Sequence, residues 1–107
     1  MMIAQTTTNI AFQSNLAFKN MKVISEFYGV KILMEEQIKY INPIFHASYG
    51  DFHGSFLAKE LKMYKGFLPQ KITSLVLEWA YNHREEILEN YLRVLKNEGI
   101  KEIEPLI

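Results

Sequence analysis

The sequence of 107 residues has no cysteine, few prolines and glycines, and no long apolar run. The absence of cysteine excludes a disulfide scaffold, a thiolate nucleophile and any zinc or iron–sulfur site with cysteine ligands. No stretch approaches the roughly 18–20 apolar residues that a membrane-spanning helix needs, so we expect no membrane association and a cytoplasmic location. The apolar content of 49% suits one modest core, and the length suits one domain.

An excess of charge is lacking too, because twelve acidic residues cancel twelve basic residues. No overall field therefore draws the chain to nucleic acid or to acidic lipid. The charges are unevenly spread, however, and one short segment has four lysines against the single acid Glu60. These are Lys59, Lys62, Lys65 and Lys71. They fit either an ordinary solvated surface or a small basic edge that contacts RNA.

The first twenty residues contain no acid and a single lysine, unlike the rest of the chain. They have no apolar run behind a positive charge and no arginine, so we expect neither a secretory signal nor a targeting peptide. We expect instead an N-terminal arm over residues 1–20 and a single α+β domain over residues 21–107. On this interpretation, Met21 is a candidate for an alternative start.

Between residues 21 and 68, short segments rich in β-branched and aromatic residues alternate with turn signals. Gly29 interrupts the first segment, as a bulge or bend would. The turn signals are Asn42-Pro43, Gly50-Asp51 and Lys59-Glu60. Short strands joined by short turns predict a small antiparallel meander of three to four strands.

A long helix is expected after the meander. Pro69 favours a first helical turn and Gly99 a helix end, so the helix should span residues 70–97. At about 1.5 Å per residue its length is on the order of 40 Å, long for so small a domain. It must overhang the sheet or kink, and Asn82-His83 is its weakest stretch by helix propensity. The expected fold class is therefore α+β, a meander packed against one long C-terminal helix.

This helix has two apolar stripes when its residues are projected at about 100° each. The first stripe is narrow enough to be covered by one face of the sheet. The second stripe consists of Leu77, Tyr81, Leu88, Leu92 and Leu95. Its cover would be the N-terminal arm, the C-terminal residues 103–107, a second subunit or a partner protein. Because exposed leucines are a liability, we treat this second stripe as a candidate protein interface.

Side chains suited to chemistry are few. The histidines are His46, His53 and His83. Glu86 lies three residues after His83 on one edge of the expected helix, and His46 on a facing strand would complete a metal site with them. A histidine that faces a core is more often a hydrogen-bonded packing residue, so we predict no metal and no cofactor.

Patterns for nucleophilic catalysis are missing, because no serine lies on a glycine-flanked elbow and no glycine-rich loop suits phosphate. A metal-free ribonuclease would use histidine, lysine and arginine as general acid, base and phosphate clamp. His46 or His53, together with the lysine segment 59–71, is the set that fits this chemistry.

Six motifs, in this order, resemble the bacterial family named domain of unknown function 4160. They are VISEFYGV (23–30), PIFHA (43–47), GFLP (66–69), LEWA (77–80), HREE (83–86) and IEPL (103–106). The resemblance covers residues 21–107 and rests on the order and spacing of the motifs together. It implies one half of a small two-gene module of the toxin–antitoxin kind.

The chain departs from the family pattern at one chemically important position. Where the family has histidine–phenylalanine–histidine, this chain has Ile44, Phe45 and His46. The pair of histidines on one face of a strand is therefore missing, although His46 and His83 are present. If the family works through both histidines of that pair, this member is altered.

Two functional hypotheses follow. The first, which we favour, is a non-enzymatic interaction domain that binds a protein partner or itself through the second apolar stripe, within a toxin–antitoxin-like module. The second is a small ribonuclease-type toxin that uses His46 and His83 with nearby lysines, Arg84 and Glu86 being the further catalytic candidates. Sequence-specific DNA binding is disfavoured by the neutral net charge and the lack of a second recognition helix.

Overall fold

The structure, a computed structural model, describes residues 20–37 and 41–106. In these residues the chain forms five strands and two helices. The strands are β1 (Met21–Phe27), β2 (Val30–Glu35), β3 (Ile44–Tyr49), β4 (Phe52–Leu57) and β5 (Lys62–Phe67). All neighbours pair antiparallel in the order β1-β2-β3-β4-β5, so the predicted meander is confirmed. The expected N-terminal arm lies outside the described residues apart from Asn20.

The expected number of strands, three to four, was too low, because the first apolar segment forms two strands rather than one. Tyr28 and Gly29 both have positive φ, 50° and 79°, and Phe27 pairs with Val30 across them. Positive φ at both central residues is the geometry of a tight two-residue hairpin turn. Gly29 thus reverses the chain instead of bulging it.

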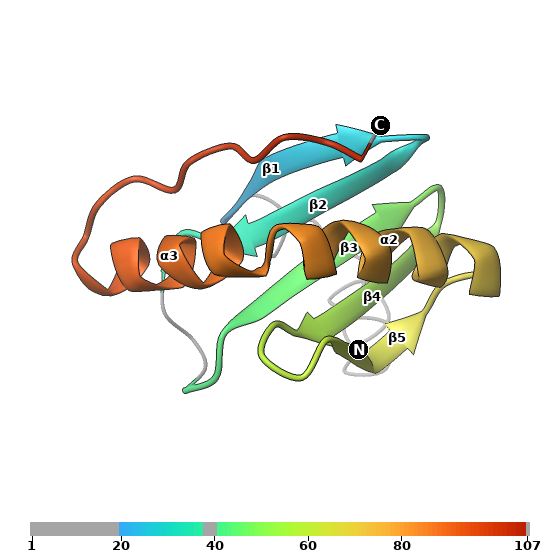
Figure 1. Cartoon of the computed structure of the whole chain (residues 1–107), viewed down its shortest axis with the longest axis horizontal. Helices are drawn as coiled ribbons and strands as arrows, with labels where there is room; N and C mark the ends of the chain where they lie inside the picture. Colours follow the sequence, from blue (N-terminus) through green and yellow to red (C-terminus); the bar gives the residue numbers. More distant parts are fainter. Residues whose placement is uncertain (1–19, 38–40, 107) are drawn as a thin grey trace, which may run out of the picture.

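The helical part consists of α2 (Gln70–Asn82) and α3 (Arg84–Leu95), which follow one another across one face of the sheet (Figure 1). The expectation of one long helix is corrected here, because His83 leaves the helical conformation with φ −121° and ψ 23°. The interruption falls at Asn82-His83, the stretch with the lowest helix propensity. Among the described residues, neither helix is long and apolar enough to cross a membrane.

The core lies between the sheet and α2–α3. Trp79 is fully buried there, with Phe45 at 6.0 Å in an edge-on contact, and Phe45 stacks on Phe56 at 5.0 Å. Burying each of these large side chains stabilises the fold by about 2–3 kcal/mol. Side chains alternate along a strand, so Phe45 and Ala47 of β3 face the helices and His46 faces the other way.

The C-terminal residues 96–106 have no regular structure and run back beside the helices toward β1 (Figure 1). Ile100 and Ile103 are buried in the core. The backbone N–H of Ile103 donates to the carbonyl of Ile24 in β1 at 2.7 Å, and Lys22 Nζ donates to the Ile100 carbonyl at 2.8 Å. This segment therefore joins the last helix to the first strand.

Candidate functional site

The break between α2 and α3 is built by His83, which ends one helix and begins the next. Its N–H donates to the Trp79 carbonyl at 3.0 Å, and its carbonyl accepts from Ile87 N–H at 3.0 Å. Glu85 and Glu86 follow in the first turn of α3. Acidic side chains stabilise a helix start because the macrodipole is positive there.

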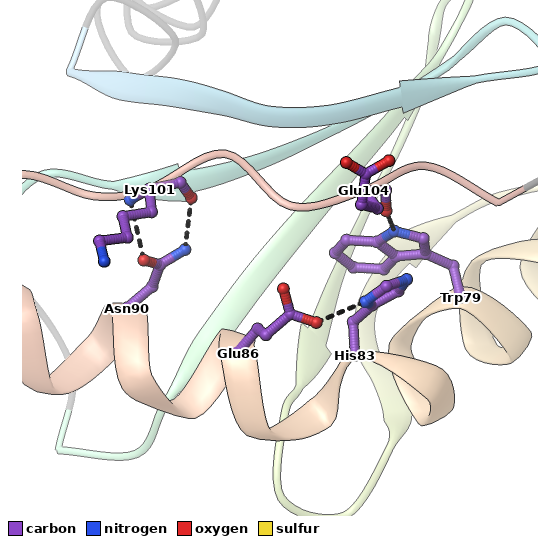
Figure 2. Close-up of polar contacts among 6 residues, drawn as sticks. All are labelled: Trp79, His83, Glu86, Asn90, Lys101 and Glu104. Atoms are coloured by element: carbon purple, nitrogen blue, oxygen red, sulfur yellow. Dashed lines mark hydrogen bonds and ion pairs between the residues drawn. The ribbon is translucent and has the colours of Figure 1, made fainter.

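The His83 ring is held between a carboxylate and an indole. Its Nδ1 lies 2.6 Å from Glu86 Oε1, and the ring centroid lies 5.6 Å from that of Trp79. The indole in turn donates from Nε1 to the Glu104 carbonyl at 2.8 Å (Figure 2). His83 and Glu86, considered above as two ligands of one metal site, contact each other directly across the first turn of α3. Residues 81–86 line an open depression on the surface at this point.

Arg84 connects the break to the sheet. Its Nη2 donates to the carbonyl of Lys59, in the turn between β4 and β5, at 2.6 Å. Three of the four catalytic candidates, His83, Arg84 and Glu86, thus lie together at the break. The Arg84 guanidinium thus contacts the β4–β5 turn and the His83 ring contacts Trp79.

His46 lies apart from this cluster, on the face of the sheet turned away from the helices. The sheet therefore separates His46 from His83, and the structure does not bring the two together. His46 is 9% exposed. Its Nε2 is 2.9 Å from Glu35 Oε1 and its Nδ1 is 2.8 Å from Ser55 Oγ. The imidazole thus lies within hydrogen-bond distance of a carboxylate on one side and of a hydroxyl on the other.

This carboxylate–imidazole–hydroxyl chain spans β2, β3 and β4, and Glu35 and Ser55 were not among the predicted site residues. The hairpin turn at Gly50-Asp51 fixes Ser55 as the partner of His46, so the sequence holds a signal for that contact. No comparable signal exists for Glu35, because a longer connection joins β2 to β3. Ile44 lies two residues before His46 on the same face and is 7% exposed.

His53, the remaining histidine, lies exposed on β4, in register with Phe67 of β5. Among the described residues, no group of three histidine, aspartate or glutamate side chains is arranged to hold a metal ion.

The second apolar stripe is divided by its packing. Leu77 and Leu88 are half-buried against the core. Tyr81 is 73% exposed, and Leu92 and Leu95 are each 52% exposed. The C-terminal residues were one candidate for covering the second apolar stripe. Ile103 and Glu104 instead contact β1 and Trp79.

The four lysines of the segment 59–71 are all exposed. Lys59 lies in the turn before β5, Lys62 and Lys65 lie on β5, and Lys71 lies in the first turn of α2. The exposed aromatic side chains Tyr64 and Phe67 lie beside them on β5.

Comparison with known proteins gives one finding. A family model described as a domain of unknown function (DUF4160) matches residues 29–91, more than half of the chain. The matched residues include His46, His83 and most of the second apolar stripe. No curated protein matches the chain. No solved structure matches it.

Proposed function

We propose that this chain, which belongs to the DUF4160 family of domains of unknown function, binds a partner protein through the outer surface of α2 and α3. The setting we propose is a two-gene module of the toxin–antitoxin kind, in which the partner is the other product. The observation that carries the proposal is the exposure of Tyr81, Leu92 and Leu95 on two helices whose inner sides are fully packed.

The apolar side chains on this surface follow the helical period within each helix. Leu77 and Tyr81 are one turn apart on α2, while Leu88, Leu92 and Leu95 follow at spacings of four and three on α3. Complete burial of a leucine stabilises a complex by about 2 kcal/mol, so these side chains can supply a central cluster of binding energy. Exposed apolar clusters of this kind mark binding surfaces.

The charges beside this surface indicate the kind of partner. Glu78 lies one turn from Tyr81, and Glu85 and Glu89 lie one turn from Leu88 and Leu92. All three glutamates are exposed, so they form an acidic border along the apolar residues. Complementary potentials favour association, and we therefore expect a partner with a basic border around an apolar groove.

The test compares what the chain captures in its own host with what Leu92→Glu captures. A charge in the centre of an apolar interface should weaken binding by at least about 2 kcal/mol, or roughly thirtyfold. We expect one stoichiometric partner, identified by mass spectrometry, with the original chain and its loss with Leu92→Glu.

The matched control is Phe67→Ser, which removes an exposed apolar side chain from β5 instead. It should leave capture unchanged. The proposal is wrong if no stoichiometric protein is captured, if Leu92→Glu captures it equally, or if light scattering shows that Leu92 instead joins two copies of the chain.

A further inference from the structure

The β5 edge of the sheet combines positive charge with exposed rings. We propose that this edge binds single-stranded RNA, with bases stacking on its aromatic side chains and lysines neutralising the phosphates. The surface, here called the β5 platform, is defined by Phe52, Lys62, Tyr64, Lys65 and Phe67, with Lys59 and Lys71 at its ends.

The rings of the platform are accessible and partly ordered by one another. Phe67 is 61% exposed, and Phe52 and Tyr64 are each 42% exposed. The rings of Phe52 and Phe67 meet edge to face, with centroids 5.6 Å apart. An exposed aromatic ring fixed by a neighbour offers a flat surface on which an unpaired base can stack.

A pair of glycines allows β5 to lie close enough to β4 for this contact. Gly54 and Gly66 are directly opposite in the register. Gly66 has φ +90°, and a Cβ atom on it would lie 2.3 Å from the His53 carbonyl oxygen. Only glycine fits this position, so the backbone beside Phe67 is fixed in a conformation that other residues would disrupt.

The lysines of the platform are available for phosphates. Lys59, Lys62, Lys65 and Lys71 are all exposed, and within residues 20–37 and 41–106 none of their ammonium groups forms an ion pair. Glu60 is the only acid between Lys59 and Lys71. The local charge is therefore positive although the chain as a whole is neutral.

The geometry favours a single strand over a duplex. A duplex reader inserts a helix or ribbon into a groove, whereas the outer surface of α2 and α3 is bordered by glutamates. Unpaired bases that can stack on aromatic rings occur chiefly in the loops and ends of RNA, which is why we assign RNA rather than DNA.

The experiment measures binding of the full chain to a fluorescein-labelled single-stranded RNA of mixed sequence and about 12 nucleotides, within the usual footprint of small single-strand binders. Fluorescence anisotropy should give a dissociation constant in the range of about 1–100 μM at 50–200 mM salt. Contacts from three to four lysines should give a slope of log K against log salt of about −2 to −3.

Phe67→Ser should weaken binding about tenfold with an unchanged salt slope, since it removes stacking only. The double variant Lys62→Gln and Lys65→Gln should reduce the slope by about 1.4, since it removes two phosphate contacts. Tyr81→Ser, which changes an exposed ring on α2, and Lys96→Gln, which changes an exposed lysine at the C-cap of α3, are the matched controls and should bind as the original chain does.

Backbone amide shifts on RNA addition give a second readout that needs no substitution, and they should concentrate in residues 59–67.

The proposal is overturned by the absence of binding at about 100 μM RNA in 50 mM salt, by tighter binding of duplex RNA or of single-stranded DNA, or by equal effects of the control substitutions. Shifts confined to α2 and α3 would also overturn it. Because the proposed protein interface lies on the helices, failure here leaves that proposal intact.

Discussion

Asn90 is 2% exposed on the inner side of α3, and its side-chain amide pairs with the backbone of Lys101 as a second peptide group would. Its Nδ2 donates to the Lys101 carbonyl and its Oδ1 accepts from the Lys101 N–H, both at 2.9 Å (Figure 2). The sequence offers a signal for this role, since Asn90 is a polar residue between Ile87 and Val94 on the core side of the helix. No such signal marks Lys101, because it lies in a segment whose apolar residues follow neither a helical nor a strand period.

Substitution Asn90→Ala should lower the free energy of unfolding by about 2 kcal/mol, because it leaves both backbone groups of Lys101 unpaired and opens a small cavity. Chemical denaturation measures this directly. Asn82→Ala, at an exposed position of α2, is the control and should change stability by less than about 0.5 kcal/mol. Equal effects of the two substitutions would show that the Lys101 contact is not stabilising.

Histidine chemistry was predictable only where contacts are local. The contact of His83 with Glu86 joins the N-cap of α3 to its first turn, three residues later, so it is local in the sequence. The contacts of His46 depend on which strands are neighbours and in what register, so Ser55 is predictable only through a short turn and Glu35 is not. A buried carboxylate–imidazole–hydroxyl chain therefore arises from residues that no sequence motif joins.

At the scale of elements, the structure differs from the expected fold at one turn and at one helix break. Two positive φ values at Tyr28 and Gly29 turned one expected strand into a hairpin. The helix breaks at His83, where propensity is lowest and where Trp79 and Glu86 hold the ring. Local chemistry thus predicts the meander and the place of the break. The path of residues 96–106 depends on distant partners in β1 and could not be predicted.

The close pairing of β4 with β5 can be tested by substitution. Gly66→Ala should destabilise the fold by more than about 2 kcal/mol, because the added Cβ would lie 2.3 Å from the His53 carbonyl oxygen at a φ of +90°. Gly99→Ala, where an added Cβ meets no atom within 4 Å, should change stability by less than about 1 kcal/mol. Thermal unfolding of the two variants measures this difference. Equal losses of stability in both variants would contradict the explanation.

At the scale of the whole molecule, two surfaces of opposite character lie on different layers. The helices present apolar residues bordered by Glu78, Glu85 and Glu89, while the β5 platform presents aromatic rings and lysines. A neutral net charge conceals this separation, since it averages over both layers. The sequence already shows the lysine segment 59–71, but the placement of these lysines on the β5 edge, beside exposed aromatic rings, comes from the structure.

Because the surfaces are separate, their functions should be separable. Leu92→Glu should leave the affinity for single-stranded RNA within about twofold of the original, and Phe67→Ser should leave capture of the partner protein unchanged, because Leu92 lies on α3 and Phe67 on β5. Anisotropy and co-purification measure the two effects in the same preparations. Loss of both activities in either variant would mean that the surfaces act as one, or that the substitution unfolds the chain, which circular dichroism distinguishes.

The proposed protein interface is tested most directly by methyl NMR of the leucine side chains during titration with the captured partner. We predict shifts at Leu88, Leu92 and Leu95 on α3, with Leu57 of β4, on the opposite side of the sheet, unchanged. Shifts at Leu57 without shifts at the three α3 leucines would contradict the assignment of α2 and α3 as the partner-binding surface.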